Sequence, residues 1–134
     1  MPNKNVELSK KVAKEIDAQK HQCWNNSVMA VYILDDILHG AVYVEGWIVY
    51  IVPIEHGWIE LTDGTIVDPT IPEAIDVLYF AGVKYSREEI ETRLEENGEI
   101  RPPFVYEHGF GGFKCESYLS AYNTAFSHID YTRG

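Results

Sequence analysis

The sequence of 134 residues contains no long apolar run. No segment approaches the ~20 consecutive apolar residues that a membrane-spanning helix needs. The stretch from Met1 to Lys14 is polar and contains lysines, whereas a secretory signal has an apolar centre. These absences predict a cytoplasmic protein without a membrane partner.

Basic residues and cysteines are also scarce. Lys and Arg number 11 against 21 Asp and Glu, and the formal net charge of −10 repels phosphate backbones, so we expect no nucleic-acid partner. The charge indicates either solubility or attraction of a basic substrate. The two cysteines, Cys23 and Cys115, are too few for a disulfide framework, and a reducing compartment would keep both as thiols.

The composition is that of a globular chain. Hydrophobic residues make up 46% and charged residues 24%. A chain of this length can bury roughly 65 to 70% of its unfolded surface, which is enough for one core. The sequence therefore predicts a single domain over residues 1–134.

Periodicity and turn residues predict an α+β fold, with a central helix lying on an antiparallel sheet. The buried helix is the most apolar element, and the strand after it is expected to bend or bulge at Gly46. A capping box of Ser86 and Glu89 marks a later helix. The expected helices are Val6–Gln19, Cys23–Leu38, Pro72–Leu78, Arg87–Glu96 and Lys114–His128, and the expected strands are Ala41–Val52, Ile54–Leu61 and Thr65–Asp68.

One predicted hairpin brings two titratable side chains together. The Asp-Gly pair at 63–64 is a turn signal between two strand-like segments. His56 lies at the start of the first strand and Asp68 at the end of the second. The hairpin therefore makes these two residues neighbours.

Cys23 is the candidate nucleophile because it opens the buried helix. Free amides and the positive end of the helix dipole favour a thiolate there, and we expect only Cys23, not Cys115, to have this helix-start position and the His and Asp motifs downstream. Nucleophilic catalysis needs a base beside the thiol and an acceptor that orients the base. Cys23, His56 and Asp68 are thus predicted to act as nucleophile, base and orienting residue.

Three short motifs in this order resemble those of transglutaminases. They are Gln-Cys-Trp at 22–24, His-Gly-Trp at 56–58 and Asp-Pro-Thr at 68–70, and the block at 43–46 resembles small bacterial and phage proteins of the same superfamily. Papain-like peptidases also begin their central helix with Cys-Trp. The resemblance implies a papain-like or transglutaminase-like fold, with the cysteine on a central helix and the histidine and aspartate on the sheet.

The resemblance implies a cysteine hydrolase that acts as a peptidase, amidase or deamidase on a protein, peptide or small amide. The chain is far shorter than the calcium-dependent transglutaminases, so neither a cofactor nor a metal is expected. A minimal acyltransferase is one alternative. A catalytically idle protein that binds a partner in the same cleft is another.

Four further residues are weaker candidates for substrate or oxyanion contacts. Gln22 is either an oxyanion donor or a loop residue, and Asn26 is either a donor or a structural hydrogen-bonding residue. Trp58 is an oxyanion donor or else a core or pocket-wall residue, and Glu45 is a cleft residue or a solvated residue at a strand edge. A rival to the whole scheme is a zinc site made of His21, Cys23, His56 and Asp68.

Overall fold

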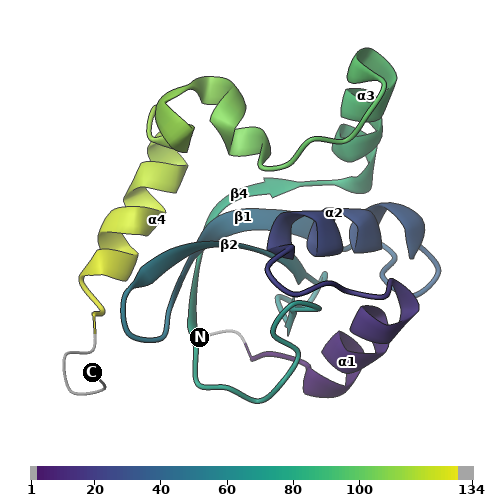
Figure 1. Ribbon diagram of the computed structural model, residues 1–134, viewed down its shortest axis with the longest axis horizontal. Helices are drawn as coiled ribbons and strands as arrows, with labels where there is room; N and C mark the ends of the chain where they lie inside the picture. The colour runs from purple at the N-terminus through teal and green to yellow at the C-terminus, as the bar shows by residue number, and fades with distance from the viewer. Residues whose placement is uncertain (1–2, 130–134) are drawn as a thin grey trace.

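The computed structural model describes residues 3–129 (Figure 1). It is a mixed α+β fold, as the sequence predicts. Residues 1–2 and 130–134 of the expected single domain lie outside the described residues. The elements in chain order are α1 (Val6–Glu15), α2 (Cys23–Ile33), β1 (Val42–Val49), β2 (Pro53–Glu60), β3 (Ile66–Val67), β4 (Leu78–Tyr85), α3 (Arg87–Asn97), the short 3-10 helices η1 (Phe104–His108) and η2 (Phe110–Gly112), and α4 (Glu116–Phe126).

The four strands form one antiparallel sheet in the order β3-β2-β1-β4. The predicted hairpin of β2 and β3 is confirmed, with Ile59 opposite Val67. The predicted irregularity is also confirmed, because the register between β1 and β4 shifts between Glu45 and Gly46. A Cβ at Gly46 would overlap the backbone of β4, so glycine allows the two strands to approach there.

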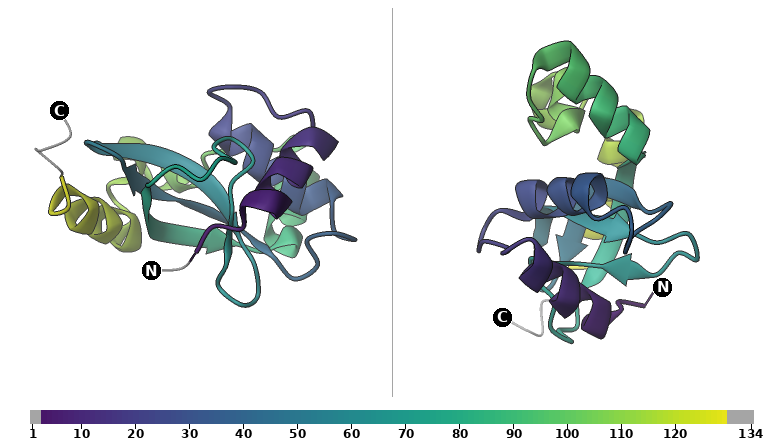
Figure 2. Two further views of the ribbon diagram at one scale, coloured as in Figure 1. Left: turned by 90° about the horizontal axis from the view of Figure 1, so that it is seen from below. Right: turned by 90° about the vertical axis from the view of Figure 1, so that its right-hand side faces the viewer.

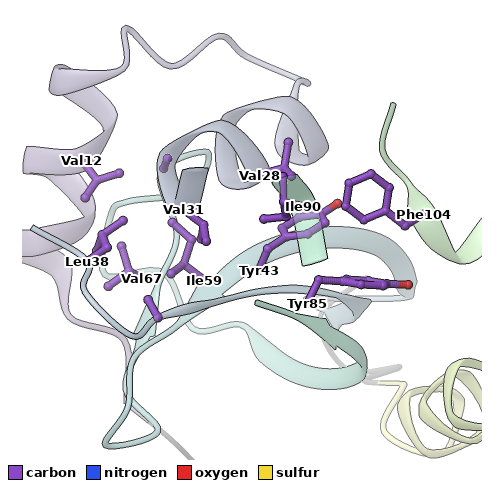
Figure 3. Packing of buried hydrophobic residues seen from close by; sticks show 12 residues of the cluster. Val12, Val28, Val31, Leu38, Tyr43, Ile59, Val67, Tyr85, Ile90 and Phe104 are labelled. Carbon is purple, nitrogen blue, oxygen red and sulfur yellow. The ribbon is translucent and has the colours of Figure 1, made fainter. Parts of the chain in front are cut away.

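The helices pack on one face of this sheet. Tyr43 and Ile59, which lie opposite each other on β1 and β2, join a cluster with Val28 and Val31 of α2 (Figure 3). Trp47, further along β1 on the same face, packs against residues of α4. As a result, α2 covers one end of the sheet and α4 the other, as Figures 1 and 2 show.

The opposite face carries a second set of buried side chains. Val44, Ile48 and Trp58 lie on it, and Ile71 and Val77 from the segment between β3 and β4 pack over them. This segment runs without a helix from 70 to 77. The sheet therefore has a helical layer on one side and a loop layer on the other.

The expected helix Pro72–Leu78 is wrong. Its last residue, Leu78, begins strand β4, which pairs with β1 along its whole length. The remaining stretch is too short to nucleate a helix easily, and contacts with the N-terminal segment hold it extended. Lys4 Nζ donates to the carbonyl oxygens of Ile71 at 2.7 Å and Glu73 at 2.8 Å.

The buried helix ends earlier than expected, at Ile33 instead of Leu38. Asp35 and Asp36 follow, and short acidic side chains favour turns over helix interiors. By contrast, the capping box of Ser86 and Glu89 at the start of α3 is confirmed. No helix within residues 3–129 is long and apolar enough to cross a bilayer.

Candidate active site

His56 and Asp68 form a buried pair, as the hairpin prediction requires. His56 Nε2 lies 2.8 Å from Asp68 Oδ2. His56 is 4% exposed and Asp68 is fully buried. The short β2–β3 connection thus places an acidic group against one ring nitrogen of a histidine, where water cannot compete for it.

Four hydrogen bonds besides the one with His56 hold Asp68 in place. Its Oδ1 accepts from the backbone amides of Thr70 and Ile71, each at 3.1 Å, and its Oδ2 accepts from the Tyr79 hydroxyl at 2.8 Å. Its own backbone amide donates to Ser9 Oγ of α1 at 2.9 Å. A carboxylate with this many partners cannot rotate away from the histidine.

The charges of this pair support each other. Burial raises the pKa of Asp68, but the charge and hydrogen bond of His56, with the Ile71 amide, hold it below its usual range. Burial likewise lowers the pKa of His56, but Asp68 and then Cys23 raise it to about 9. His56 therefore carries a proton at neutral pH.

Cys23 lies close to the imidazole, since both residues line one cleft and the Cys23 carbonyl oxygen lies beside Gly57. Its side chain also raises the pKa of His56. Since Asp68 occupies Nε2, the nitrogen that remains for this interaction is Nδ1. Asp68 thus fixes one ring nitrogen, and the thiol lies in the cleft that the imidazole lines.

Gly57 allows α2 to start close to His56. A Cβ at Gly57 would lie 2.8 Å from Trp24 Cε3 and 3.3 Å from the carbonyl oxygen of Cys23. One turn into the helix, Ser27 Oγ donates to the Gly57 carbonyl oxygen at 3.1 Å. The missing side chain and this hydrogen bond together fix the first turn of α2 against β2.

The thiol and the imidazole face a cleft of about 470 Å³. Its walls come from the α1–α2 connection, from β1 and β2, and from the segment that follows Asp68. The lining residues are Lys20, His21, Cys23, Ile48, Ile54, Glu55, His56, Thr70 and Ile71. A substrate in this cleft would therefore contact both groups at once.

Asn26 connects two walls of the cleft. Its Nδ2 donates to the Gln19 carbonyl oxygen at 2.8 Å and to Thr70 Oγ1 at 2.9 Å, while its Oδ1 accepts from the Gln19 amide. Both amide hydrogens are therefore used within the protein. This leaves Asn26 as a residue that positions the walls, with no donor left for an oxyanion.

Gln22 caps the start of α2 from an exposed position. Its Oε1 accepts from Asn25 Nδ2 at 3.1 Å. Its backbone amide donates to the Gln19 carbonyl oxygen, but within residues 3–129 its side-chain nitrogen, Nε2, donates to no protein acceptor and can bind an oxyanion. The free amides of the first turn of α2 lie beside it.

Trp58 is a core residue that packs against His56 and does not line the cleft. It is 2% exposed, and its ring stacks on His56 with centroids 6.1 Å apart and an interplanar angle of 20°. Tyr79 packs against the edge of Trp58 at 5.1 Å. The two rings shield the histidine–carboxylate pair from solvent.

Glu45 is neither a cleft residue nor a solvated strand-edge residue. It is fully buried, because β1 is a central strand with β2 on one side and β4 on the other. Its carboxylate accepts from the Tyr43 hydroxyl and from the backbone amides of Phe104 and Val105 at 2.6 to 2.7 Å. Its contribution is to hold η1 on the sheet.

Sequence reasoning missed two residues that support the acid. Tyr79 lies on β4, which no prediction covered, and Ser9 lies on the helix expected only as a surface element. The alternating apolar and aromatic residues of 78–85 were a usable strand signal. No local signal indicates that Ser9 faces Asp68.

Two other expectations need correction. Cys115 is the N-cap of α4, so a helix start does not distinguish it from Cys23; both are free and half-buried. Among residues 3–129, no three His, Cys, Asp or Glu side chains are arranged to hold a metal ion. The four residues of the zinc alternative therefore do not form a metal site.

Comparison of the chain with known protein families, with curated proteins and with solved structures finds no match. Any function must therefore be argued from the residues of the cleft.

Proposed function

We propose that this protein is a thiol hydrolase of the papain-like or transglutaminase-like kind, cleaving an amide or related acyl bond. The observation that carries the proposal is the arrangement around His56. Asp68 hydrogen-bonds to one ring nitrogen at 2.8 Å, and Cys23, which raises the pKa of His56, lines the same open cleft. A nucleophile, a base and an orienting acceptor in contact are the minimum set for acyl transfer to a cysteine.

In the first half of the reaction, the Cys23 thiolate attacks the acyl carbon. The positive charge of protonated His56 stabilises that thiolate. His56 Nδ1 then gives its proton to the leaving amine, and a thioester to Cys23 remains. The first-turn amides of α2 and the side-chain amide of Gln22, the residue before Cys23, are the candidate donors to the oxyanion.

In the second half, neutral His56 takes a proton from water, and the resulting hydroxide attacks the thioester. The carboxylic acid leaves, and the proton returns to the Cys23 sulfur–His56 pair. Asp68 remains ionised throughout and keeps the imidazole in position. No further group is needed to balance either half.

The test is thiol reactivity followed by activity-based probes. Iodoacetamide at limiting concentration near neutral pH should modify Cys23 faster than Cys115, as read by peptide mapping. Electrophilic probes with different acyl groups, read by intact mass, would then show which group Cys23 prefers. Faster labelling of Cys115, or a Cys23–Cys115 disulfide in protein kept from air, would remove the basis of the proposal.

The two alternatives differ from hydrolysis in whether a thioester forms at Cys23 and in which molecule then accepts the acyl group. An acyltransferase passes the acyl group to an amine, and an idle binding protein forms no thioester with any probe. Cys23 and His56 line one cleft of about 470 Å³. Efficient transfer to an amine also needs a second shaped pocket, which binds the amine and excludes water. Cleft size therefore favours hydrolysis.

A further inference from the structure

Glu55 lies next to His56 in β2 but points to the opposite face of the strand, because side chains alternate there. Two tyrosines from the C-terminal part of the chain hold its carboxylate. Tyr106 Oη of η1 donates to Oε2 at 2.7 Å, and Tyr118 Oη of α4 donates to Oε1 at 2.5 Å. The carboxylate is therefore fixed in position at the wall of the cleft.

This wall is close to the nucleophile. Glu55 and Cys23 line the same cleft. Burial, then Glu55, and also the charges of Glu45 and Cys23, raise the pKa of Tyr106 to about 12. Tyr106 therefore lies within the electrostatic range of both the carboxylate and the thiol, while its hydroxyl donates its hydrogen bond to Glu55.

The negative charge of Glu55 has no counter-ion. It forms no ion pair with any side chain of residues 3–129. Each carboxylate oxygen has about two acceptor positions, and the tyrosine hydroxyls use one on each. A half-buried, immobilised carboxylate with acceptor positions left over is suited to bind a cation that enters the cleft.

We propose that Glu55 is the specificity-determining residue of the cleft and that it binds an ammonium or guanidinium group of a basic peptide substrate. The inference rests on the proposed function, since it places the bound cation beside the acyl carbon that Cys23 attacks. The formal net charge of −10 favours the approach of such a substrate. Lys20, which also lines the cleft, is exposed, so solvent screens its opposing charge.

The charge selectivity of Cys23 tests this subsite without a known substrate. All proteins would carry Cys115→Ser, so that only Cys23 reacts. Two methanethiosulfonate reagents of similar size, one with a trimethylammonium group and one with a sulfonate group, would modify Cys23 at pH 7 and low salt. Intact mass would give the rate for each reagent. The measured quantity is the rate with the trimethylammonium reagent divided by the rate with the sulfonate reagent.

Three variants separate charge from geometry. Glu55→Gln removes the charge at nearly constant volume and should lower the ratio about tenfold, because one charge changes each rate by a factor of about 3 in opposite directions. Glu88→Gln on α3 removes the same net charge elsewhere and should leave the ratio unchanged. Tyr106→Phe removes one hydroxyl but keeps the carboxylate, so the preference for the cation should persist.

A protection experiment on the unmutated Glu55 decides the question if Glu55→Gln does not fold. Acetyl-lysine amide should slow the reaction of Cys23 with neutral methyl methanethiosulfonate, and acetyl-norleucine amide, which lacks the charge, should not. Equal protection by the two, or equal loss of selectivity in Glu55→Gln and Glu88→Gln, would overturn the subsite while leaving the hydrolase proposal intact. If no reagent modifies Cys23, both proposals fail.

Discussion

Raising the pH should destabilise the fold through His56. The pKa of this side chain is about 9 in the folded protein, against a usual value of 6.5. A raised pKa means that the folded state holds the proton more tightly than the unfolded chain. The stabilisation is therefore complete below about pH 6.5 and is lost as the pH rises towards 9.

The size of this effect follows from the two pKa values. Their difference corresponds to about 3 kcal/mol of unfolding free energy, and the steepest slope that one proton can give is about 1.4 kcal/mol per pH unit. Urea unfolding from pH 6 to pH 9, followed by tryptophan fluorescence, would measure the loss. Burial and a hydrogen bond to a carboxylate raise the pKa values of Tyr79 and Tyr118 further above 10, so these two side chains do not titrate in this range.

His56→Gln is the matched comparison, because it removes the titrating group and leaves the other ionisable residues in place. Its unfolding free energy should start lower than that of the wild type, since Asp68 is then buried without its charged partner. It should, however, change much less with pH. His39→Gln, which alters an exposed histidine, should keep the slope of the wild type. Parallel curves for wild type and His56→Gln would refute the reasoning.

Four further outcomes are expected. Cys23→Ala should abolish turnover of a substrate found by probe screening and shift the melting temperature by no more than about 2 °C, because little packing is lost; near wild-type turnover would exclude the residue from the mechanism. Tyr79→Phe should lower the unfolding free energy at pH 7 by about 2 kcal/mol, since it removes a hydrogen bond to ionised Asp68; a loss below about 0.5 kcal/mol in urea unfolding would contradict this. Gly57→Ala should slow iodoacetamide labelling of Cys23 more than tenfold, because the new methyl group displaces Trp24 and the start of α2; an unchanged rate would show that the spacing is not needed. With an acyl donor and millimolar amine, mass spectrometry should find mostly the hydrolysed product, and a dominant amine adduct would instead identify a transferase.

The part of the site that sequence predicted well depends on local structure. His56 and Asp68 are 12 positions apart and are joined by two strands and an Asp-Gly turn, so a short-range turn signal is enough to pair them. The start of α2 at Cys23 follows in the same way from a change in apolar pattern. Short-range signals of this kind need no knowledge of the rest of the chain.

The part that sequence missed depends on distant contacts. Glu45 was expected at a strand edge or in the cleft, but β4 and η1 bury it. Its hydrogen-bond partners Phe104 and Val105 lie 59 and 60 positions away in the sequence. Glu55 meets its tyrosines across 51 and 63 positions. No periodicity within β1 or β2 reports which later segment will cover each face, so buried partners of this kind emerge only from the three-dimensional packing.

The separation in sequence between Glu55 and its two tyrosine partners also determines the order in which the cleft can assemble during translation. Cys23, His56 and Asp68 all leave the ribosome well before Tyr118, the more distant of the two clamping residues. At roughly 5–20 residues per second, the interval from Asp68 to Tyr118 lasts several seconds. A nascent chain could therefore form the thiol–imidazole–carboxylate contacts before the Glu55 wall exists. The specificity of the cleft would then be acquired last, and an early, incomplete cleft would react with less discrimination than the finished protein.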